Sequence, residues 1–350
     1  MESINVVLAS LMIVGLMTGC GGSNSSNTEQ TSNDNTFKGP GITMTLQSDD
    51  EVKIDLQGVG TATIDWGDNS PVDSITFKNK YTLERLAHTY AQPAKQTITI
   101  IGEGIANFDC IYANLTSLDV SHCPTLKELR CYNNELTTLN VSKNPELTHL
   151  LCSNNLLTQL DLSQNANLQD LQCDRNPLKT IDVSNNTALK VLITNSAELT
   201  TLDISKNPAL ATLNCGDNQL TTIDVSKNPA LDGLFCNKNQ ITTLNLSKNP
   251  ALKNLNCEYN KLTTLDISEN SALTTLYSQK NQLSSFVIGD QPKLQYFFIP
   301  DNEFSEQALN DIFQSLPAND VKDKSIRYSN NPGADAANKS IIEKKGWTIK

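Results

Sequence analysis

Cysteines at a fixed interval are the residues of this sequence best suited to chemistry. They recur every 21 residues or at twice that interval: Cys110, Cys131, Cys152, Cys173, Cys215, Cys236 and Cys257. Repeated cysteines in an exported protein suggest disulfide bonds, and thiolates are also zinc ligands. Either chemistry requires the sulfur atoms to approach one another in a suitable geometry, so the elements that carry them decide the matter.

A regular interval of this kind places the thiols in a row on neighbouring parallel strands. The Cβ atoms of such neighbours lie ~4.8 Å apart, whereas a disulfide prefers about 3.8 Å. The same slot holds Thr194 and Ser278, so it selects small side chains. The sequence has no C-x-x-C pair, and a row of parallel thiols cannot surround a metal as a tetrahedron. We therefore predict buried free thiols that pack as small hydrophobes, and no metal site.

Other residues that support catalysis are scattered. The three histidines, His88, His122 and His149, fall in different segments, and no G-x-S-x-G, H-E-x-x-H or phosphate-binding loop occurs. A column of aspartates suggests calcium, but Asn140 and Asn245 interrupt it, and single carboxylates one repeat apart make a poor cage. Its members are Asp119, Asp161, Asp182, Asp203, Asp224 and Asp266. We predict that this column is a solvated face, and that the chain has no enzymatic activity and no cofactor.

The cysteines belong to a unit of 21 residues that recurs ten times without insertion or deletion. Residues 210–230, LATLNCGDNQLTTIDVSKNPA, are typical. The units begin at Ile105, Leu126, Leu147, Leu168, Leu189, Leu210, Leu231, Leu252, Leu273 and Leu294. The pattern L-x-x-L-x-C-x-x-N-x-L is that of a leucine-rich repeat, and it resembles the short repeats of the internalin-J-like adhesins of Gram-positive bacteria. The resemblance implies a mainly β solenoid over residues 105–304, with a parallel sheet and an extended or 3₁₀ convex side.

Two asparagine columns occupy the positions where each unit turns. An inward amide can donate and accept at once, so we expect these side chains to satisfy backbone groups that the strands leave unpaired. The first column comprises Asn134, Asn155, Asn176, Asn218, Asn239, Asn260, Asn281 and Asn302. The second comprises Asn144, Asn165, Asn186, Asn207, Asn228, Asn249 and Asn270. Cys123 stands in the slot of the second column, and the sequence does not explain it.

The N-terminus differs in composition from the repeats. Residues 1–19 contain a short apolar stretch that ends in small residues, as in a secretory signal peptide. Leu16-Met17-Thr18-Gly19-Cys20 resembles a bacterial lipobox, which implies lipid attachment at Cys20; the alternative is an unlipidated signal peptide. Residues 20–38 are Gly-, Ser- and Asn-rich and predict a flexible tether. We therefore expect an exported protein, lipid-anchored to the bacterial cell envelope at the outer membrane.

Two further modules flank the repeats. Residues 39–104 alternate apolar and polar residues between turns, which predicts a β-sandwich. Within them, residues 64–70 and His88-Thr89-Tyr90 resemble the W-x-x-G-D-G…H-x-Y signature of polycystic-kidney-disease (PKD) domains, and we expect Trp66 and His88 to be structural. Residues 305–350 predict a small α/β cap, with helices over 305–316 and 334–345 and a final strand near Trp347.

Candidate binding residues lie on the face that the repeat strands turn outward. Side chains alternate along a strand, so the positions beside the buried leucine and cysteine have no core to enter. They include seven apolar or aromatic residues that we predict to bind a ligand: Tyr132, Leu151, Ile193, Phe235, Tyr277, Tyr296 and Phe298. Exposed apolar surface of this kind usually marks an interface.

These features favour two functions for a monomeric, surface-anchored protein. The first is an adhesin that binds a protein ligand through the concave face of the solenoid. The second is a glycan-binding or enzyme-accessory module of an envelope complex, and a purely structural role stays open. A net charge of −11 and a pI of about 4.8 argue against a nucleic-acid partner, and they limit membrane contact to the lipid anchor.

Overall fold

The computed structural model describes residues 41–47, 51–79, 81–92, 94–318 and 321–350. The signal peptide, the tether and Cys20 of the sequence analysis lie outside these residues. Within the described residues, no helix is long and apolar enough to cross a membrane.

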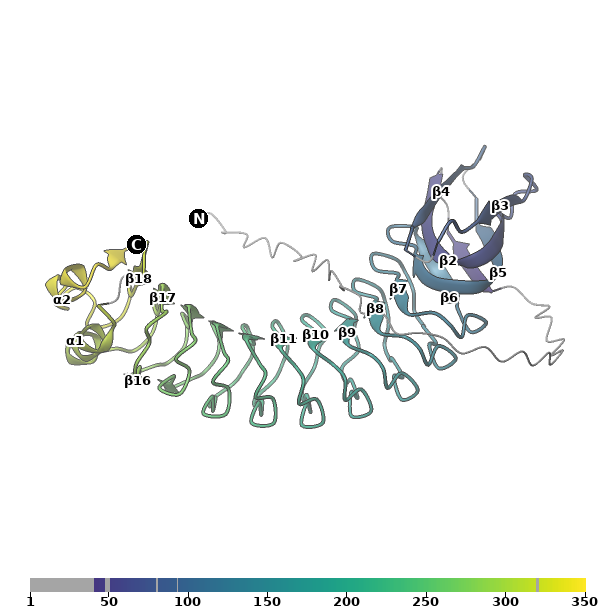
Figure 1. Cartoon of the computed structure of the whole chain (residues 1–350). Helices are drawn as coiled ribbons and strands as arrows, with labels where there is room; N and C mark the ends of the chain where they lie inside the picture. Colours follow the sequence, from purple (N-terminus) through teal and green to yellow (C-terminus); the bar gives the residue numbers. More distant parts are fainter. Residues whose placement is uncertain (1–40, 48–50, 80, 93, 319–320) are drawn as a thin grey trace. The chain divides into compact units, whose positions relative to one another are not determined.

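A parallel β-sheet runs through the repeats, with one three-residue strand in each turn (Figure 1). Each strand pairs with the next in a register of one unit, so that Leu213 of one turn faces Leu234 of the following turn. The strands are β7 (Glu128–Arg130), β8 (His149–Leu151), β9 (Asp170–Gln172), β10 (Val191–Ile193), β11 (Thr212–Asn214), β12 (Gly233–Phe235), β13 (Asn254–Asn256), β15 (Thr275–Tyr277) and β17 (Tyr296–Phe298). The predicted leucine-rich-repeat solenoid with a parallel sheet is confirmed.

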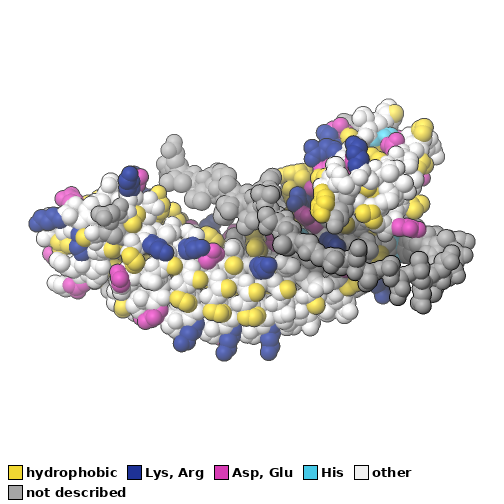
Figure 2. Space-filling model, in the orientation of Figure 1, with side chains coloured by type: hydrophobic (Ala, Val, Ile, Leu, Met, Phe, Trp, Pro, Cys, Tyr) yellow, Lys and Arg dark blue, Asp and Glu magenta, His cyan; other side chains and the backbone are white. Residues whose placement is uncertain are grey.

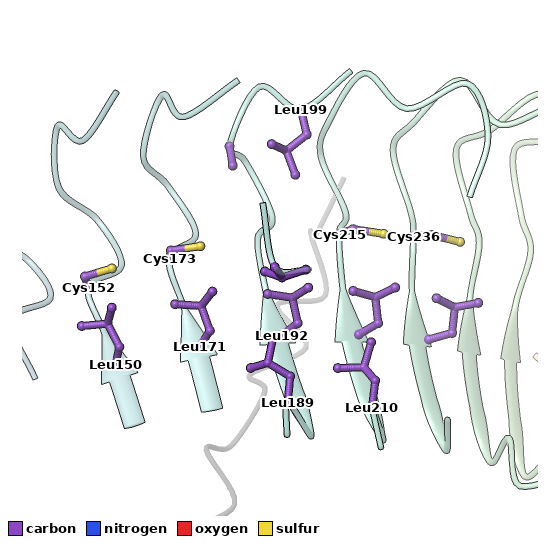
Figure 3. Packing of buried hydrophobic residues seen from close by; sticks show 14 of the residues in the cluster. Leu150, Cys152, Leu171, Cys173, Leu189, Leu192, Leu199, Leu210, Cys215 and Cys236 are labelled. Atoms are coloured by element: carbon purple, nitrogen blue, oxygen red, sulfur yellow. The ribbon is translucent and has the colours of Figure 1, made fainter. Parts of the chain in front are cut away.

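Leucines and cysteines of successive turns stack in rows inside the solenoid (Figure 3). The middle residue of each strand is buried, as Leu150 and Leu171 are, and the cysteine two positions later is also buried. All eight cysteines of the described residues are free, and burial raises the pKa of the Cys236 thiol to about 12. The prediction of free thiols is confirmed. Thr194 and Ser278, fully buried in the same slot, show that the slot is defined by size.

The far side of each unit is extended and then turns twice. Asn228 N donates to Val225 O and Leu231 N donates to Asn228 O, both at 3.1 Å, which gives two successive turns in each unit. Only β14 (Thr264–Asp266) and β16 (Ser285–Val287) pair there as a separate parallel sheet. The predicted extended segments are therefore present, and within the described residues turns take the place of a 3₁₀ helix.

The aspartate column caps these far-side turns. Each carboxylate accepts the backbone N–H two residues later, as Asp224 does from Ser226 at 2.9 Å. Asn245 accepts from Ser247 in the same way at 3.0 Å, so an amide replaces a carboxylate without loss of the bond. The column therefore serves the backbone, which explains why asparagine interrupts it.

The two asparagine columns bind the turns together through backbone carbonyls. In the first column, Asn239 Nδ2 donates to Cys215 O (3.0 Å) and Cys236 O (3.1 Å), while its Oδ1 accepts from Leu220 N (2.9 Å). In the second, Asn228 Nδ2 donates to Ile204 O (3.0 Å) and to the backbone oxygen of the preceding column member (2.9 Å). The Oδ1 atoms of the second column are buried and have no partner among the described residues. The first column therefore satisfies more backbone groups per residue.

The antiparallel strands before the repeats share a strand with them. These strands are β1 (Ile42–Leu46), β2 (Glu51–Asp65), β3 (Asp73–Thr76), β4 (Glu84–Thr89), β5 (Gln96–Asp109) and β6 (Leu115–Asp119). β5 pairs antiparallel with β1 and β2, and its last three residues pair parallel with β7. β1 also pairs with β6 of the first turn. The sheet therefore continues from one segment into the other without a break.

Cys123 is explained by this arrangement. The first turn has no earlier turn whose carbonyl oxygens an asparagine amide could reach. Instead, Cys123 Sγ donates to Gly41 O, at the start of the antiparallel segment, over 3.1 Å. The cysteine side chain is shorter than that of asparagine and has a single donor, so it suits this one acceptor.

After the last repeat the chain forms α1 (Glu306–Ser315), β18 (Ser325–Arg327), α2 (Ser340–Lys344) and β19 (Thr348–Ile349). The Ser305 side chain caps α1 by accepting from Ala308 N, and the apolar face of α1 is buried. β18 and β19 extend the parallel sheet. The helix expected over 334–345 is shorter, because Asn338 Oδ1 accepts the backbone N–H of Ser340, and the backbone N–H of Asn338 donates to Asn310 Oδ1. A local side-chain bond of this kind competes with helix formation.

Replacing Asn239 by Ala should destabilise the repeats by about 2–4 kcal/mol. The substitution leaves the N–H of Leu220 buried without a partner, at about 1–3 kcal/mol. It also removes one of the two amide donors from the carbonyls of Cys215 and Cys236, which keep the amides of Asn218 and Asn260, at about 0.5–1.5 kcal/mol for each lost bond. The measurement is urea denaturation followed by circular dichroism. Gln219→Ala, an exposed neighbour, is the control and should shift stability by less than about 0.5 kcal/mol. Equal effects of the two variants would contradict the role given to the column.

Candidate functional site

The outward side of the repeat strands forms the largest regular surface of the solenoid. The first and third residues of each strand flank the buried leucine and point away from the core, as the burial pattern of Thr212–Asn214 shows. We name the third residues of the repeat strands from β8 to β17 the central column; they are Leu151, Gln172, Ile193, Asn214, Phe235, Asn256, Tyr277 and Phe298. In Figure 1 these strands lie along the inner side of the curved stack of repeats.

The structure places five of the seven predicted binding residues in this column and two beside it. Leu151, Ile193, Phe235, Tyr277 and Phe298 are central-column residues, and all are half-buried. Tyr296 is the first residue of β17 and is 37% exposed, so the C-terminal segment leaves it open to solvent. Tyr132 follows β7. None of the seven belongs to the core, so the strand register expected from the sequence is correct.

Aromatic rings lie close together at the C-terminal end of the column. The ring centroids of Tyr277 and Phe298 are 5.2 Å apart with a 35° tilt, and those of Tyr296 and Phe298 are 6.4 Å apart with the same tilt. The Phe235 ring lies over Gly233, where an added Cβ would stand 3.1 Å from Cε2 of the ring. Glycine at that position therefore gives the ring room to lie along the strand.

Tyr132 lies apart from this group, at the other end of the face. Its ring meets Tyr112 edge-on, with centroids 6.2 Å apart. A cavity of about 170 Å³ lies nearby, lined by Gln57, Leu83, Asn107, Phe108, Asp109, Glu128 and Arg130. Sequence reasoning missed this cavity because Gln57 and Leu83 come from the antiparallel segment, whose position beside the first turns no repeat pattern predicts.

The polar groups of this cavity bind one another. Asn107 Nδ2 donates to Gln57 Oε1 (2.8 Å) and Glu128 Oε2 (3.2 Å), and Arg130 forms an ion pair with Glu128 at 2.6 Å. Burial raises the pKa of Asp109, which receives the N–H of Ile111. The cavity is small and its donors are already used, so it makes a weaker site than the column.

The outward face carries acids that have few cationic partners. Burial raises the pKa of Asp170, Asp174 and Glu258. Within the described residues, no ion pair includes Asp170 or Glu258. In Figure 2, by contrast, Lys and Arg side chains project from the edge of the repeats formed by the far-side turns. The strand side is therefore acidic, while the far-side turns carry basic side chains together with the aspartate column.

The PKD-like signature residues contact one another in the antiparallel segment. Trp66, 1% exposed, stacks on His88 at 5.0 Å, and His88 Nε2 lies 2.8 Å from Asp68 Oδ2. Tyr90 Oη donates to Trp66 O at 3.0 Å, and burial raises the pKa of Tyr90 to about 12. These contacts close a tight turn, in keeping with the structural roles expected for Trp66 and His88.

In the part of the chain that the structure describes, no three His, Cys, Asp or Glu side chains gather in a way that could hold a metal ion.

Asp170→Asn should raise the melting temperature at pH 7, and the gain should vanish as the pH falls. Burial raises the folded-state pKa of Asp170, so the ionised carboxylate opposes folding at neutral pH. That penalty decreases as the pH drops through the folded pKa, and it is gone below the unfolded value of about 3.9.

Asp203→Asn is the matched control, and it should change the melting temperature at neutral pH in the opposite direction. Hydrogen bonds from Ser205 lower the pKa of Asp203, so its charge stabilises the fold above the unfolded pKa and this stabilisation is lost in acid. Melting curves of both variants between neutral and acidic pH are the measurement. A gain for Asp170→Asn that persists in acid would show that charge burial is not its cause.

Comparison with known proteins gives matches in structure alone. No protein-family model matches the chain, and no curated protein sequence matches it.

Three solved structures illustrate the likeness in fold. The functional domain of InlJ from Listeria monocytogenes, which includes a cysteine ladder, is 26% identical, with 69% of this chain and 72% of that chain covered and a TM-score of 0.47. The internalin InlF from the same species is 18% identical, with 70% and 86% covered and a TM-score of 0.47.

The third is the leucine-rich-repeat ectodomain of the plant membrane receptor kinase GASSHO1/SCHENGEN3 from Arabidopsis thaliana, solved in complex with CASPARIAN STRIP INTEGRITY FACTOR 2. It is 25% identical with a TM-score of 0.51; 61% of this chain is covered, but only 28% of the ectodomain. The hydrogen-bonded register of the turns and this likeness lead to one conclusion: residues 105–304 fold as a leucine-rich-repeat solenoid.

Proposed function

We propose that this chain is a bacterial cell-envelope lipoprotein that binds a protein ligand through the outward strand face, in adhesion or another cell-surface interaction. The observation that carries the proposal is the row of half-buried apolar side chains in the central column, including Leu151, Phe235 and Tyr277, which point away from the core. A solenoid ectodomain of similar fold has been solved in complex with a separate factor, which supports the use of this fold for a ligand.

The energetics favour an interface at this column. Core packing does not require Ile193 or Phe235, since each lies outside the buried layer formed by Leu192 and Leu234. Removing such apolar surface from water contributes roughly 25 cal/mol per Å², and aromatic residues dominate binding hot spots. A partner that covers the column would therefore gain affinity without disturbing the fold.

A glycan ligand is the second candidate, and the aromatic group favours it. The rings of Tyr277 and Tyr296 are each tilted by 35° to that of Phe298, and this aromatic cluster offers ring faces on which a sugar ring can stack. This group occupies only the last two turns of the face, whereas the central column continues over eight turns. We therefore place the protein ligand first.

The remaining parts of the chain fit an anchored binding protein. We propose a signal peptide over residues 1–19, a lipid on Cys20 and a tether over 20–38, on the sequence features alone. The PKD-like segment 39–104 would hold the solenoid away from the membrane, and residues 305–350 would cover its far end. Membrane contact through the lipid, a monomeric state and an outer-membrane location belong to the same proposal, as does the absence of enzymatic activity.

Cys20→Ala should release the protein from membranes. The substitution removes the thiol that would carry the lipid, and the apolar stretch before it is too short to span a bilayer. Expression in a Gram-negative host, followed by fractionation and a carbonate wash, is the measurement. A variant that stays in the washed membrane pellet would exclude lipid attachment at this residue.

Phe235→Ala combined with Tyr277→Ala should weaken ligand capture and preserve the melting temperature. Truncating a hot-spot aromatic typically costs 2 kcal/mol or more, roughly thirtyfold in affinity, whereas surface changes usually stay within about 0.5 kcal/mol of stability. The measurement is capture of extracellular-matrix proteins and of glycans, immobilised on separate arrays, by the full chain.

Leu156→Ala is the matched control, because Leu156 is 52% exposed and lies outside the strand face. It should change neither capture nor melting. A large loss of stability in the double variant would mean that these rings are core. Unchanged capture by a stable double variant would move the ligand site away from the central column.

A further inference from the structure

Between Leu151 and Tyr277 the central column has a period of two turns, twice that of the repeat itself; the alternation ends there, because the next member, Phe298, is also aromatic. Its apolar residues Leu151, Ile193, Phe235 and Tyr277 follow one another at intervals of 42 residues, since 193 − 151 = 235 − 193 = 277 − 235. The turns between them present amides: Gln172, Asn214 and Asn256. Packing inside the solenoid does not demand this alternation, because the buried neighbours are leucine in every one of these turns. The alternation is therefore a property of the surface.

The period sets a distance that a ligand must match. Neighbouring parallel strands lie ~4.8 Å apart, so the apolar side chains stand ~9.6 Å apart along the stack. An extended β-strand presents side chains to one side every ~6.8 Å. An α-helix repeats its face after seven residues, or ~10.5 Å. A polyproline II helix repeats every three residues, or ~9.3 Å.

The difference between the side-chain spacing of the ligand and that of the column adds up along the stack, and it does so by different amounts for the three conformations. Over the three intervals from Leu151 to Tyr277 the column extends ~29 Å. Three turns of polyproline II cover ~28 Å, while three helical repeats cover ~31 Å. The side-chain spacing of a β-strand already differs from that of the column by ~2.8 Å in the first interval. Polyproline II alone keeps an apolar side chain within about 1 Å of each column residue along this length.

The intervening asparagines are oriented as donors. Asn214 Oδ1 accepts the N–H of Gly216 at 3.2 Å, and Asn256 Oδ1 accepts the N–H of Glu258 at 3.1 Å. With each oxygen held by its own backbone, the amide nitrogen is the atom that can donate to a ligand. Asn256 Nδ2 gives one N–H to Glu258 Oε1 over 3.4 Å, so its second N–H is the one that would face a ligand. A polyproline II segment has no internal hydrogen bonds, so its carbonyl oxygens are open acceptors.

The charges on the outward face further restrict the kind of ligand that can bind. Asp170 lies beside the amide of Gln172, and Glu258 follows Asn256 by two positions on the same outward side. Neither carboxylate belongs to an ion pair in the described part of the chain. A ligand with lysine or arginine among its other residues would supply these partners.

We propose that the central column binds a proline-rich, basic protein segment in the polyproline II conformation, with every third side chain of the segment packed on Leu151, Ile193, Phe235 and Tyr277. The carbonyls of the segment accept from Asn214 and Asn256, and its basic residues pair with Asp170 and Glu258. The inference rests on the proposed function and names the kind of partner that this face recognises.

Binding of labelled peptides to the purified full chain, followed by fluorescence anisotropy, tests the spacing. One probe is a peptide of five Leu-Pro-Lys triplets. Two others carry the same five leucines at every second or every fourth position, with proline and lysine at the remaining positions. The triplet peptide should bind at least about tenfold more tightly than the other two, and Phe235→Ala should weaken it by roughly thirtyfold. Asn256→Asp, which replaces the donor by an acceptor, should weaken it by about tenfold or more, while Leu156→Ala leaves binding unchanged.

Four outcomes would overturn the inference. Equal binding of the three spacings would mean that charge alone attracts the peptides. Tighter binding of another spacing, still lost in Phe235→Ala, would reject polyproline II but keep a protein-binding column. If the triplet peptide does not bind but a matrix protein is captured through the column, polyproline II is likewise rejected and the protein-binding column is kept. Column-dependent binding of an oligosaccharide, with no peptide bound, would instead reject both this inference and the proposed protein ligand.

Discussion

Backbone hydrogen bonds between neighbouring turns fix where every outward side chain of the repeat region lies. Because each strand pairs with the next in a register of one unit, residues 21 positions apart stack directly over one another. The strands are only three residues long, so side-chain amides must complete the bonding where each turn bends. Asn239 and its counterparts do this by joining carbonyls of two turns at once. A column of ligand-facing side chains follows from this bonding.

The order of the repeats made much of the structure predictable. The period, the strand register, the free thiols and the outward position of Phe235 and Tyr277 all follow from local rules that each unit repeats. A gap in the pattern shows how local these rules are. Where Ala197 stands in place of an asparagine, Leu178 N turns to Asn176 O at 2.8 Å, and Lys179 adopts a positive φ of 63°. Glu198, next to Ala197, also has a positive φ of 60°, so the disturbance covers these two turns.

Features that depend on contacts between distant segments were less accessible. The continuation of β5 from an antiparallel segment into the first parallel turn cannot be read from a period, since it depends on pairing with β1 and β2. The same holds for Cys123, whose partner Gly41 is 82 residues away. The shortened α2 reflects a single side-chain contact between Asn338 and Asn310. Ring orientation at Phe235 also depends on an absent side chain, that of Gly233.

The alternation along the central column has a consequence for how such a protein can change in length. Loss or gain of one 21-residue unit would keep the strand register and the core, since each turn presents the same leucines and the same cysteine slot. It would, however, bring two apolar residues or two amides side by side and shift every later residue of the column by half a period. Loss or gain of two units would leave the alternation intact. A duplication or deletion of one repeat in the gene would therefore preserve the fold. Only a duplication or deletion of two repeats would also preserve the surface.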